Sequence, residues 1–170
     1  MTSIIKVDQI QTAAGATPTA ADLGIADATG TIVAAYTAAS SMSSQTNAST
    51  SQTDITGMTI TLTPKSAANT ILIGAVISAE TYGSHADKGV RFGIYRGSTS
   101  IYSNEYDLYN SQSATQRIQK SPLMFLENAA STASRTYKIT FSSTRTDSNA
   151  TARVNNYGEP STMYIFEIAG

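Results

Sequence analysis

The chain has 170 residues and a mass of 17.9 kDa, which is enough for one domain with a hydrophobic core, or for a small domain preceded by an arm. Its 11 basic and 12 acidic residues give a formal net charge of −1, so no strong field is available to attract nucleic acid or an anionic membrane. The absence of cysteine excludes disulfides, thiolate metal sites and a cysteine nucleophile, and the single histidine, His85, excludes any site that needs two imidazoles.

Serine and threonine take the place of charged residues in this chain. Only 14% of the residues are charged, against about 25% in average soluble domains, whereas 22 serines and 25 threonines make up more than a quarter of the chain. No apolar run reaches the ~18 residues of a membrane span. The first residues also lack the sustained apolar stretch of a signal peptide, so we expect the chain to be made and kept in a cytosol. These features argue against most enzyme classes.

The first thirty residues differ in pattern from the rest of the chain. They begin with a short strand pattern that has Ile5 and Val7 on one face and Ile4 and Ile10 on the other, so neither face is polar. A segment this short cannot bury enough apolar surface to be stable by itself. We therefore predict that residues 1–30 form an extended arm, which either frays, folds back on the main domain or docks on another protein.

From residue 31 onward, short strand patterns alternate with turn-forming sequences. The predicted strands span residues 31–37, 58–63, 70–78, 90–95, 101–102, 117–126, 137–142, 151–156 and 163–168. The strand at 70–78 is apolar on both faces and is expected at the centre of a sheet, whereas Pro122 indicates an edge strand or a bulge. The Gly-containing turn at residues 96–99 predicts a hairpin between the strands at 90–95 and 101–102. The polar stretch at 40–53 is predicted to be an exposed loop.

This spacing of strands predicts an all-β fold, an antiparallel jelly-roll-like β-sandwich preceded by an extended N-terminal arm. The expected boundaries are residues 1–30 for the arm and 31–170 for the sandwich. No stretch of the sequence predicts a helix of more than ten residues, and no internal repeat indicates a solenoid or a propeller.

The residue types of a hydrolase triad occur together only around His85, next to Ser84 and Asp87. A triad needs a buried carboxylate that orients the imidazole and a nucleophile on a strained turn, and residues this close in sequence rarely supply both. The chain has no phosphate-binding loop, no zinc-ligand spacing and no acidic spacing like that of a calcium loop. We therefore predict no catalytic residue, no metal site and no cofactor. The scattered basic residues indicate a solvated face and no nucleic-acid partner.

The segment from residue 102 to 110 concentrates tyrosine, asparagine and acidic residues. Tyr102, Tyr106 and Tyr109 alternate there with Asn104 and Asp107. Tyrosine gives a recognition surface a large contact area at low entropic cost, and aromatic planes with amide and carboxylate groups suit the faces and hydroxyls of sugars. We name these five residues as candidates for contact with a receptor. The alternative is that one or two of the tyrosines cover the end of the sandwich core.

Several segments of the chain are similar to tailed-bacteriophage virion surface proteins, of the tail-fibre, head-fibre or decoration type. The opening sequence at 2–15 resembles the starts of such proteins. Further segments resemble their Ser/Thr-rich β-sandwich tips; these are residues 54–73, 89–97, 137–141 and 163–168. The resemblance implies a trimeric component of the virion, attached through its N-terminal segment and exposing its C-terminal tip.

The function implied by this resemblance is that of a non-enzymatic virion surface protein, made in the cytoplasm of the host bacterium. Its partners would be two further copies of itself, other proteins of the capsid or tail, and a glycan on the host surface. Fibres usually carry a long shaft, and only about fifteen residues separate arm and sandwich here, so a short knob fits as well as a fibre.

Three alternative functions remain open from the sequence. A capsid cement protein would use the arm and the sandwich base to bridge capsid subunits, and would occur in hundreds of copies per particle. A virion-associated glycan-degrading enzyme would need two carboxylates about 5 to 9.5 Å apart. A free lectin-like module would bind glycans without using the arm.

Overall fold

The computed structural model describes residues 29–40, 43–112 and 116–170. The predicted attachment residues Ile4, Ile5, Val7 and Ile10 therefore lie outside the described residues. The strands are β1 (Ile32–Ala39), β2 (Gln45–Asn47), β3 (Thr53–Leu62), β4 (Thr70–Tyr82), β5 (Lys88–Arg96), β6 (Thr99–Ser103), β7 (Leu108–Asn110), β8 (Arg117–Asn128), β9 (Arg135–Ser143), β10 (Thr151–Val154) and β11 (Thr162–Ile168), with a 3-10 helix, η1 (Asn156–Gly158), before β11. Within these ranges no helix is long and apolar enough to cross a membrane.

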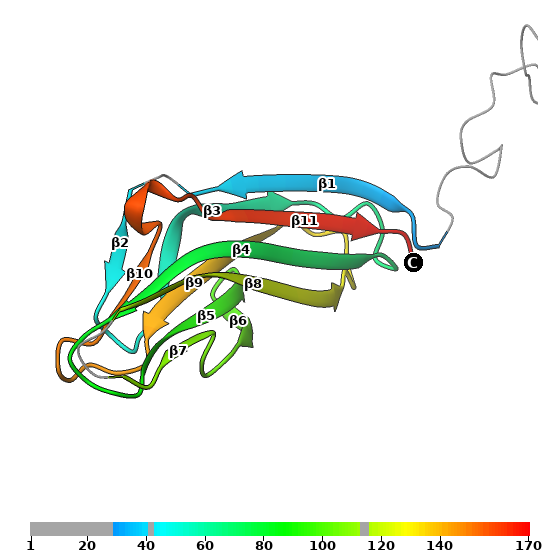
Figure 1. The fold of residues 1–170 in the computed structure, drawn as a ribbon. Coiled ribbons are helices and arrows are strands. Elements are labelled where there is room, and N and C mark those ends of the chain that lie inside the picture. The colour runs from blue at the N-terminus through cyan, green and yellow to red at the C-terminus, as the bar shows by residue number, and fades with distance from the viewer. Residues whose placement is uncertain (1–28, 41–42, 113–115) are drawn as a thin grey trace, which may run out of the picture.

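The strands form two antiparallel sheets that pack against each other (Figure 1). In the first sheet, β4 lies between β8 on one side and the collinear pair β10 and β11 on the other, and β2 and β1 pair with the outer sides of β10 and β11. In the second sheet the order is β3–β9–β5, and β6 and β7 share the remaining side of β5.

Three pairs of strands are collinear: β1 with β2, β6 with β7 and β10 with β11. Each pair counts as one position, which leaves eight strand positions. Numbered along the chain, these positions follow the order 1-8-3-6 in the first sheet and 2-7-4-5 in the second. The first position thus pairs with the last, the second with the seventh, and so on inward, which is the strand order of a jelly roll. The predicted all-β, jelly-roll-like sandwich is confirmed.

Three local predictions about the strands are also confirmed. The segment predicted to be central is β4, which pairs with other strands on both sides. Pro122 lies in β8, an edge strand that in the described part of the chain pairs only with β4. The predicted hairpin around Gly97 joins β5 to β6, with Arg96 opposite Thr99. In each case a local pattern indicated the position of the strand or turn within its sheet.

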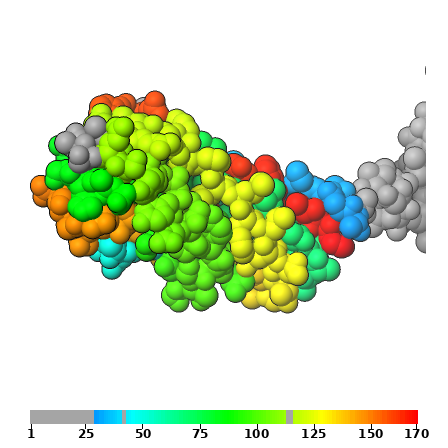
Figure 2. Space-filling view, turned by 60° about the horizontal axis from the view of Figure 1, so that its bottom comes forward, coloured from blue at the N-terminus to red at the C-terminus, as the bar shows by residue number. Residues whose placement is uncertain are grey.

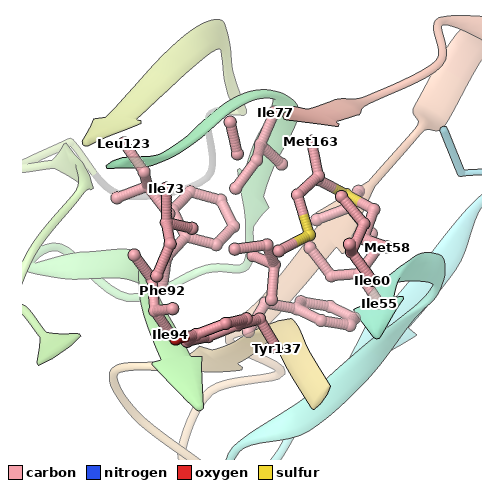
Figure 3. Packing of buried hydrophobic residues seen from close by; sticks show 14 of the residues in the cluster. Ile55, Met58, Ile60, Ile73, Ile77, Phe92, Ile94, Leu123, Tyr137 and Met163 are labelled. Carbon is pink, nitrogen blue, oxygen red and sulfur yellow. The ribbon is translucent and has the colours of Figure 1, made fainter. Parts of the chain in front are cut away.

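The core lies between the two sheets and is filled by alternate side chains of the facing strands. Ile73 and Ile77 point inward from β4 and are fully buried. Phe92 of β5 and Tyr137 of β9 fill the space opposite them, as Figure 3 shows. Burial of one such side chain contributes about 1.5–3 kcal/mol. The threonines that alternate with the core residues of β3 are exposed.

A polar cluster at the edge of the core joins the two sheets. The carboxylate of Glu127 in β8 lies 2.9 Å from the guanidinium of Arg96 in β5 and 3.9 Å from that of Arg135 in β9. It also accepts a hydrogen bond from the hydroxyl of Tyr137. Burial, followed by this bond to Glu127, raises the pKa of Tyr137 above its ordinary value, so the hydroxyl stays protonated and continues to donate.

The break between β10 and β11 is held by buried polar side chains. Asn155 adopts a left-handed conformation, and its side-chain oxygen accepts hydrogen bonds from the hydroxyls of Ser40 at 2.9 Å and Ser161 at 2.7 Å. The hydroxyl oxygen of Ser161 in turn accepts the backbone N–H of Ser78 at 3.0 Å. A buried donor without a partner costs about 1–3 kcal/mol. These bonds avoid that cost at the point where the chain leaves the sheet after β10 and re-enters it at β11.

A short strand lies within residues 40–53, where the sequence predicts an exposed loop. This strand, β2, pairs with β10. Asn47 at its end is buried, and its amide nitrogen donates at 2.9 Å to the carbonyl oxygens of Phe141 and Ser51. The prediction of an entirely exposed loop is wrong at β2, because backbone pairing and a buried amide require no apolar side chain.

Gly57 occupies an irregular part of β3 that only glycine fits. Its φ is +88°, and the register with β9 shifts between Asp54 and Thr59. A Cβ atom at this position would lie 2.7 Å from the carbonyl oxygen of Ala39 in β1. Gly97, by comparison, has a φ of +61° and open space around its Cβ position.

We expect Gly57→Ala to destabilise the protein more than Gly97→Ala. The left-handed conformation alone costs a non-glycine residue about 1–2 kcal/mol, and the overlap with Ala39 should add about 1–3 kcal/mol to the cost of Gly57→Ala. Urea unfolding of both variants measures the difference. Equal losses of unfolding free energy would contradict the close packing of Gly57 against β1.

Candidate recognition site

The two ends of the sandwich differ in what they carry. β1 begins at Ile32, which pairs with Ile168 at the end of β11. β4 runs from this end to Tyr82 at the opposite end (Figure 1). Two loops lie beyond that opposite end, residues 83–87 and 144–150, and the N–H of Ser84 donates to the carbonyl of Ser148 between them. Residues 104–107 lie beside β5 near the same end and are bonded to its backbone at Phe92 and Val90. We call these three segments the distal loops. In Figure 2 the green and orange loop segments lie at the left, far from the blue start of β1.

Residues 104–107 fill a gap in the hydrogen-bond ladder of β5. β6 pairs with β5 from Gly93 onward and β7 pairs with it up to Val90, so the backbone between them has no strand partner on that side. The carboxylate of Asp107 accepts the N–H of Phe92 at 2.6 Å, and its own N–H donates to the carbonyl of Val90 at 2.9 Å. Asp107 therefore stabilises the fold at the gap in the β5 ladder.

Tyr102, another predicted contact residue, supports the core. It is partly buried at the end of β6, and its ring centroid lies 6.0 Å from that of Phe125 in β8. This contact joins the edges of the two sheets. Burial, followed by the charge of Asp107, raises the pKa of the Tyr102 hydroxyl. Tyr102 therefore fits the alternative interpretation, in which a tyrosine covers the end of the sandwich core, and not that of a receptor contact.

Tyr106 and Tyr109 form an exposed aromatic pair next to the distal loops. Their ring centroids are 5.2 Å apart at an interplanar angle of 83°, and 43% and 37% of the two residues is exposed. The hydroxyl of Tyr109 donates a hydrogen bond to the carboxylate of Asp87, which raises the pKa of Tyr109. Asn104, also exposed, accepts the backbone N–H of Glu105 at 2.9 Å.

Charged side chains of the distal loops surround this pair. Arg145 forms a bidentate ion pair with Asp147, with distances of 2.8 and 3.0 Å. This pairing lowers the pKa of Asp147 to about 2. It also raises the pKa of Arg145, and the charge of Asp87 contributes further. The imidazole of His85 lies 3.6 Å from the carboxylate of Asp147.

The structure does not assemble the triad residues around His85. The hydroxyl of Ser84 donates to the carbonyl of Ser148 at 2.9 Å, and Asp87 accepts from Tyr109. The carboxylate beside His85 therefore belongs to Asp147, and it is half exposed and already paired with an arginine. Among the described residues, no group of three or more His, Asp or Glu side chains is placed to hold a metal ion.

The side chains brought together here define what we call the distal cluster, which consists of Tyr106, Tyr109, Asp87, Arg145 and Asp147. The sequence predicted its tyrosines but not its charged members. In the sequence, Asp87 stands out only as a neighbour of His85, and the loop that carries Arg145 and Asp147 is distant from the tyrosines. The turn-forming run from residue 144 to 149, which carries both charges, is the signal that marks this loop.

A groove continues from the distal cluster along the surface. It has a volume of about 270 Å³ and is lined by residues 110–112, 116 and 117. The guanidinium of Arg117 donates to the carbonyl of Tyr109 at 2.6 Å and so fixes the groove against the aromatic pair. Ring faces, carboxylates, a guanidinium and a polar groove together present the groups that bind sugar rings and hydroxyls.

No family model and no curated protein matches this chain. Among solved structures, the chain is similar to one of infectious bursal disease virus, Gx strain, with a TM-score of 0.42 and 13% identity over 81% of this chain and 37% of that chain. It is similar also to a crystal structure of the VP2 subviral particle of that virus, with a TM-score of 0.43 and 12% identity over 82% of this chain and 39% of that chain. The chain thus spans less than half the length of either. The assignment of the jelly roll rests on the strand order given above.

We expect Asp107→Ala to destabilise the fold, because it removes the acceptor of the Phe92 N–H. The loss should be about 1–3 kcal/mol in the free energy of unfolding. Asp107→Asn keeps a side-chain acceptor and should lose less. Urea unfolding at neutral pH compares the two variants, and an unaffected Asp107→Ala protein would contradict the structural task of this carboxylate.

The wild type and Asp107→Asn together provide a pH test. Burial raises the pKa of Asp107 in the folded protein above its ordinary value of 3.8, so the folded state binds this proton more tightly than the unfolded chain does. The stability of the wild type relative to Asp107→Asn should therefore increase as the pH falls through the raised pKa toward 3.8. A difference that stays constant over this window contradicts the burial of the carboxylate.

Proposed function

We propose that this chain is a non-enzymatic surface protein of a bacteriophage virion. It is a homotrimeric knob or short fibre in which residues 1–30 attach to the capsid or tail and residues 31–170 form the exposed jelly roll. The observation that carries this proposal is the polarity of the molecule. β1 begins at one end and the distal cluster lies at the other, so a chain attached through its N-terminal arm presents the tyrosine pair outward.

The ligand that fits the distal cluster best is a glycan of the host cell surface. Stacking on Tyr106 or Tyr109 would contribute about 1–3 kcal/mol per ring. The carboxylate of Asp87 and the guanidinium of Arg145 would then orient the sugar through its hydroxyls. A single site of this kind binds weakly. Several copies on one particle convert weak binding into firm adhesion through their effective concentration.

A second candidate, a capsid cement protein, is favoured by a different observation. The side chains of Met124 and Leu126 in β8 are 70% and 57% exposed, which indicates a lateral contact with another protein surface. A cement protein would bridge capsid subunits through such a surface and through the arm. Copy number separates the two functions, since cement proteins occur in hundreds of copies per particle and tail appendages in a few dozen or fewer.

The double change Tyr106→Ser and Tyr109→Ser should reduce adsorption of particles to cells while leaving particle assembly intact. Loss of the stacking contacts should weaken binding of the isolated glycan by about 10-fold or more. Tyr95→Ser, a change of a partly exposed tyrosine in β5 outside both the cluster and the groove, is the matched control and should adsorb normally. Fragile particles with normal adsorption would instead support the cement function.

The double change Ile5→Asp and Val7→Asp should prevent incorporation into particles. It places unpaired charges in the apolar contact through which we propose that the arm binds. The purified variant should still fold, as circular dichroism can show. Thr2→Asp with Gln11→Asp adds the same charge at polar positions of the arm and serves as the control. Normal incorporation of the Ile5→Asp, Val7→Asp protein would place the anchor elsewhere.

A further inference from the structure

The outer face of the first sheet carries rows of apolar side chains at the end where β1 begins. The register aligns Phe166 of β11, Leu72 of β4 and Leu126 of β8 in one row. The next row holds Tyr164, Gly74 and Met124, and a side chain at Gly74 would overlap the Tyr164 ring. We call this surface, with Val76 in the row beyond, the apolar face.

The apolar face contains no charged side chain. On the same side of β8, the nearest charged residue is Lys120, which forms an ion pair with Glu159 at 2.8 Å. A partner that covers the face therefore buries no charge, which would be costly unless it were paired. Isolated exposed apolar residues are ordinary on a protein surface, whereas aligned rows of them mark a contact with another surface.

The free edge of β8 is unsuited to the addition of a further strand. Pro122 in the middle of the edge has no N–H to donate to a neighbouring strand. Lys120 places a charge two residues away, as edge strands that resist pairing commonly do. An extended peptide bound along this edge would therefore lose backbone hydrogen bonds. The surface left for a partner is the face of the sheet.

The face has the dimensions that another sheet covers. Three strands about 4.8 Å apart and three rows about 7 Å apart along each strand make a patch about 10 Å wide across the strands and about 14 Å long. Two sheets pack in this way about 10 Å apart, with their side chains interdigitated. Because the patch is uncharged, identical copies can also meet there without repulsion between like charges.

We infer that the apolar face packs against other copies of this chain and is turned toward the axis of the trimer, an inference that rests on the trimer proposed above. The position of the other functional parts agrees with this arrangement. β1 begins in the same sheet and at the same end as the face, so the arms of the copies emerge close together. The tyrosine pair lies by β5 and β7 of the second sheet and stays exposed.

The test is the mass of the full chain in solution and its response to charge on the apolar face. Sedimentation equilibrium of the wild type should give about three times the chain mass of 17.9 kDa. The double change Met124→Asp and Leu126→Asp should reduce this to the mass of one chain, with an unchanged circular dichroism spectrum because both residues are exposed in a single copy. Tyr157→Asp, at a residue that is 67% exposed outside the face, should remain trimeric.

The outcomes separate this inference from the proposed function. A monomeric wild type overturns both the trimer and the inference. A trimer that survives Met124→Asp with Leu126→Asp overturns the inference alone, and a wild-type dimer that dissociates on this change overturns the threefold arrangement. Dissociation of the trimer by Ile5→Asp with Val7→Asp would show that the arm covers the apolar face, and this result would also overturn the inference.

A thiol provides a second measurement, because the chain has no cysteine. Met124→Cys should lose its reactivity toward a charged thiol reagent at concentrations where the protein is trimeric, and regain it on dilution to the monomer. Tyr157→Cys should react at both concentrations. Full reactivity of Met124→Cys in the trimer would overturn the inference even if the mass agreed.

Discussion

Between Ile71 and Ile77, β4 is apolar on both of its faces, and much of the molecule depends on this constraint. Its inward residues, such as Ile73 and Ile77, form one wall of the core against the second sheet. Its outward residues Leu72 and Val76 cannot be covered by the same sheet. A central strand of an antiparallel sheet usually has one solvated face, so the outward residues Leu72 and Val76 are the part of β4 that the inferred contact between copies would cover.

The separation of tasks between the two ends follows from how the jelly roll closes. Because the first strand pairs with the last, the N-terminal entry and the chain end share one end of the sandwich. The loops 83–87 and 144–150 lie at the other end, near the gap in the β5 ladder that Asp107 fills, and Tyr106 and Tyr109 stay exposed beside them. Loops on a rigid sandwich can differ in sequence without destabilising the core, and binding sites commonly occur on such loops.

The fold was predictable from the sequence because alternation and turn residues are local signals. The hairpin at Gly97 and the edge position of Pro122 follow from such signals. β2 was missed because Asn47 is buried through hydrogen bonds to distant backbone, which no local pattern reveals. The candidate site was half predictable: clustering of tyrosines is visible in the chain, but the task of Asp107 at Phe92 and the approach of Arg145 depend on loops far apart in sequence.

The polarity of one copy also restricts the symmetry of the assembly. Attachment to a particle requires that all arms of an oligomer leave from one end. Packing of two apolar faces about a twofold axis that lies between the sheets and runs across the strands would reverse one copy and send its arm the opposite way. A cyclic axis along the length of the strands keeps every arm at one end and every distal cluster at the other. Such an oligomer presents several weak sites in the same direction, so that their avidity exceeds the affinity of each by about 10²- to 10⁴-fold without any new contact.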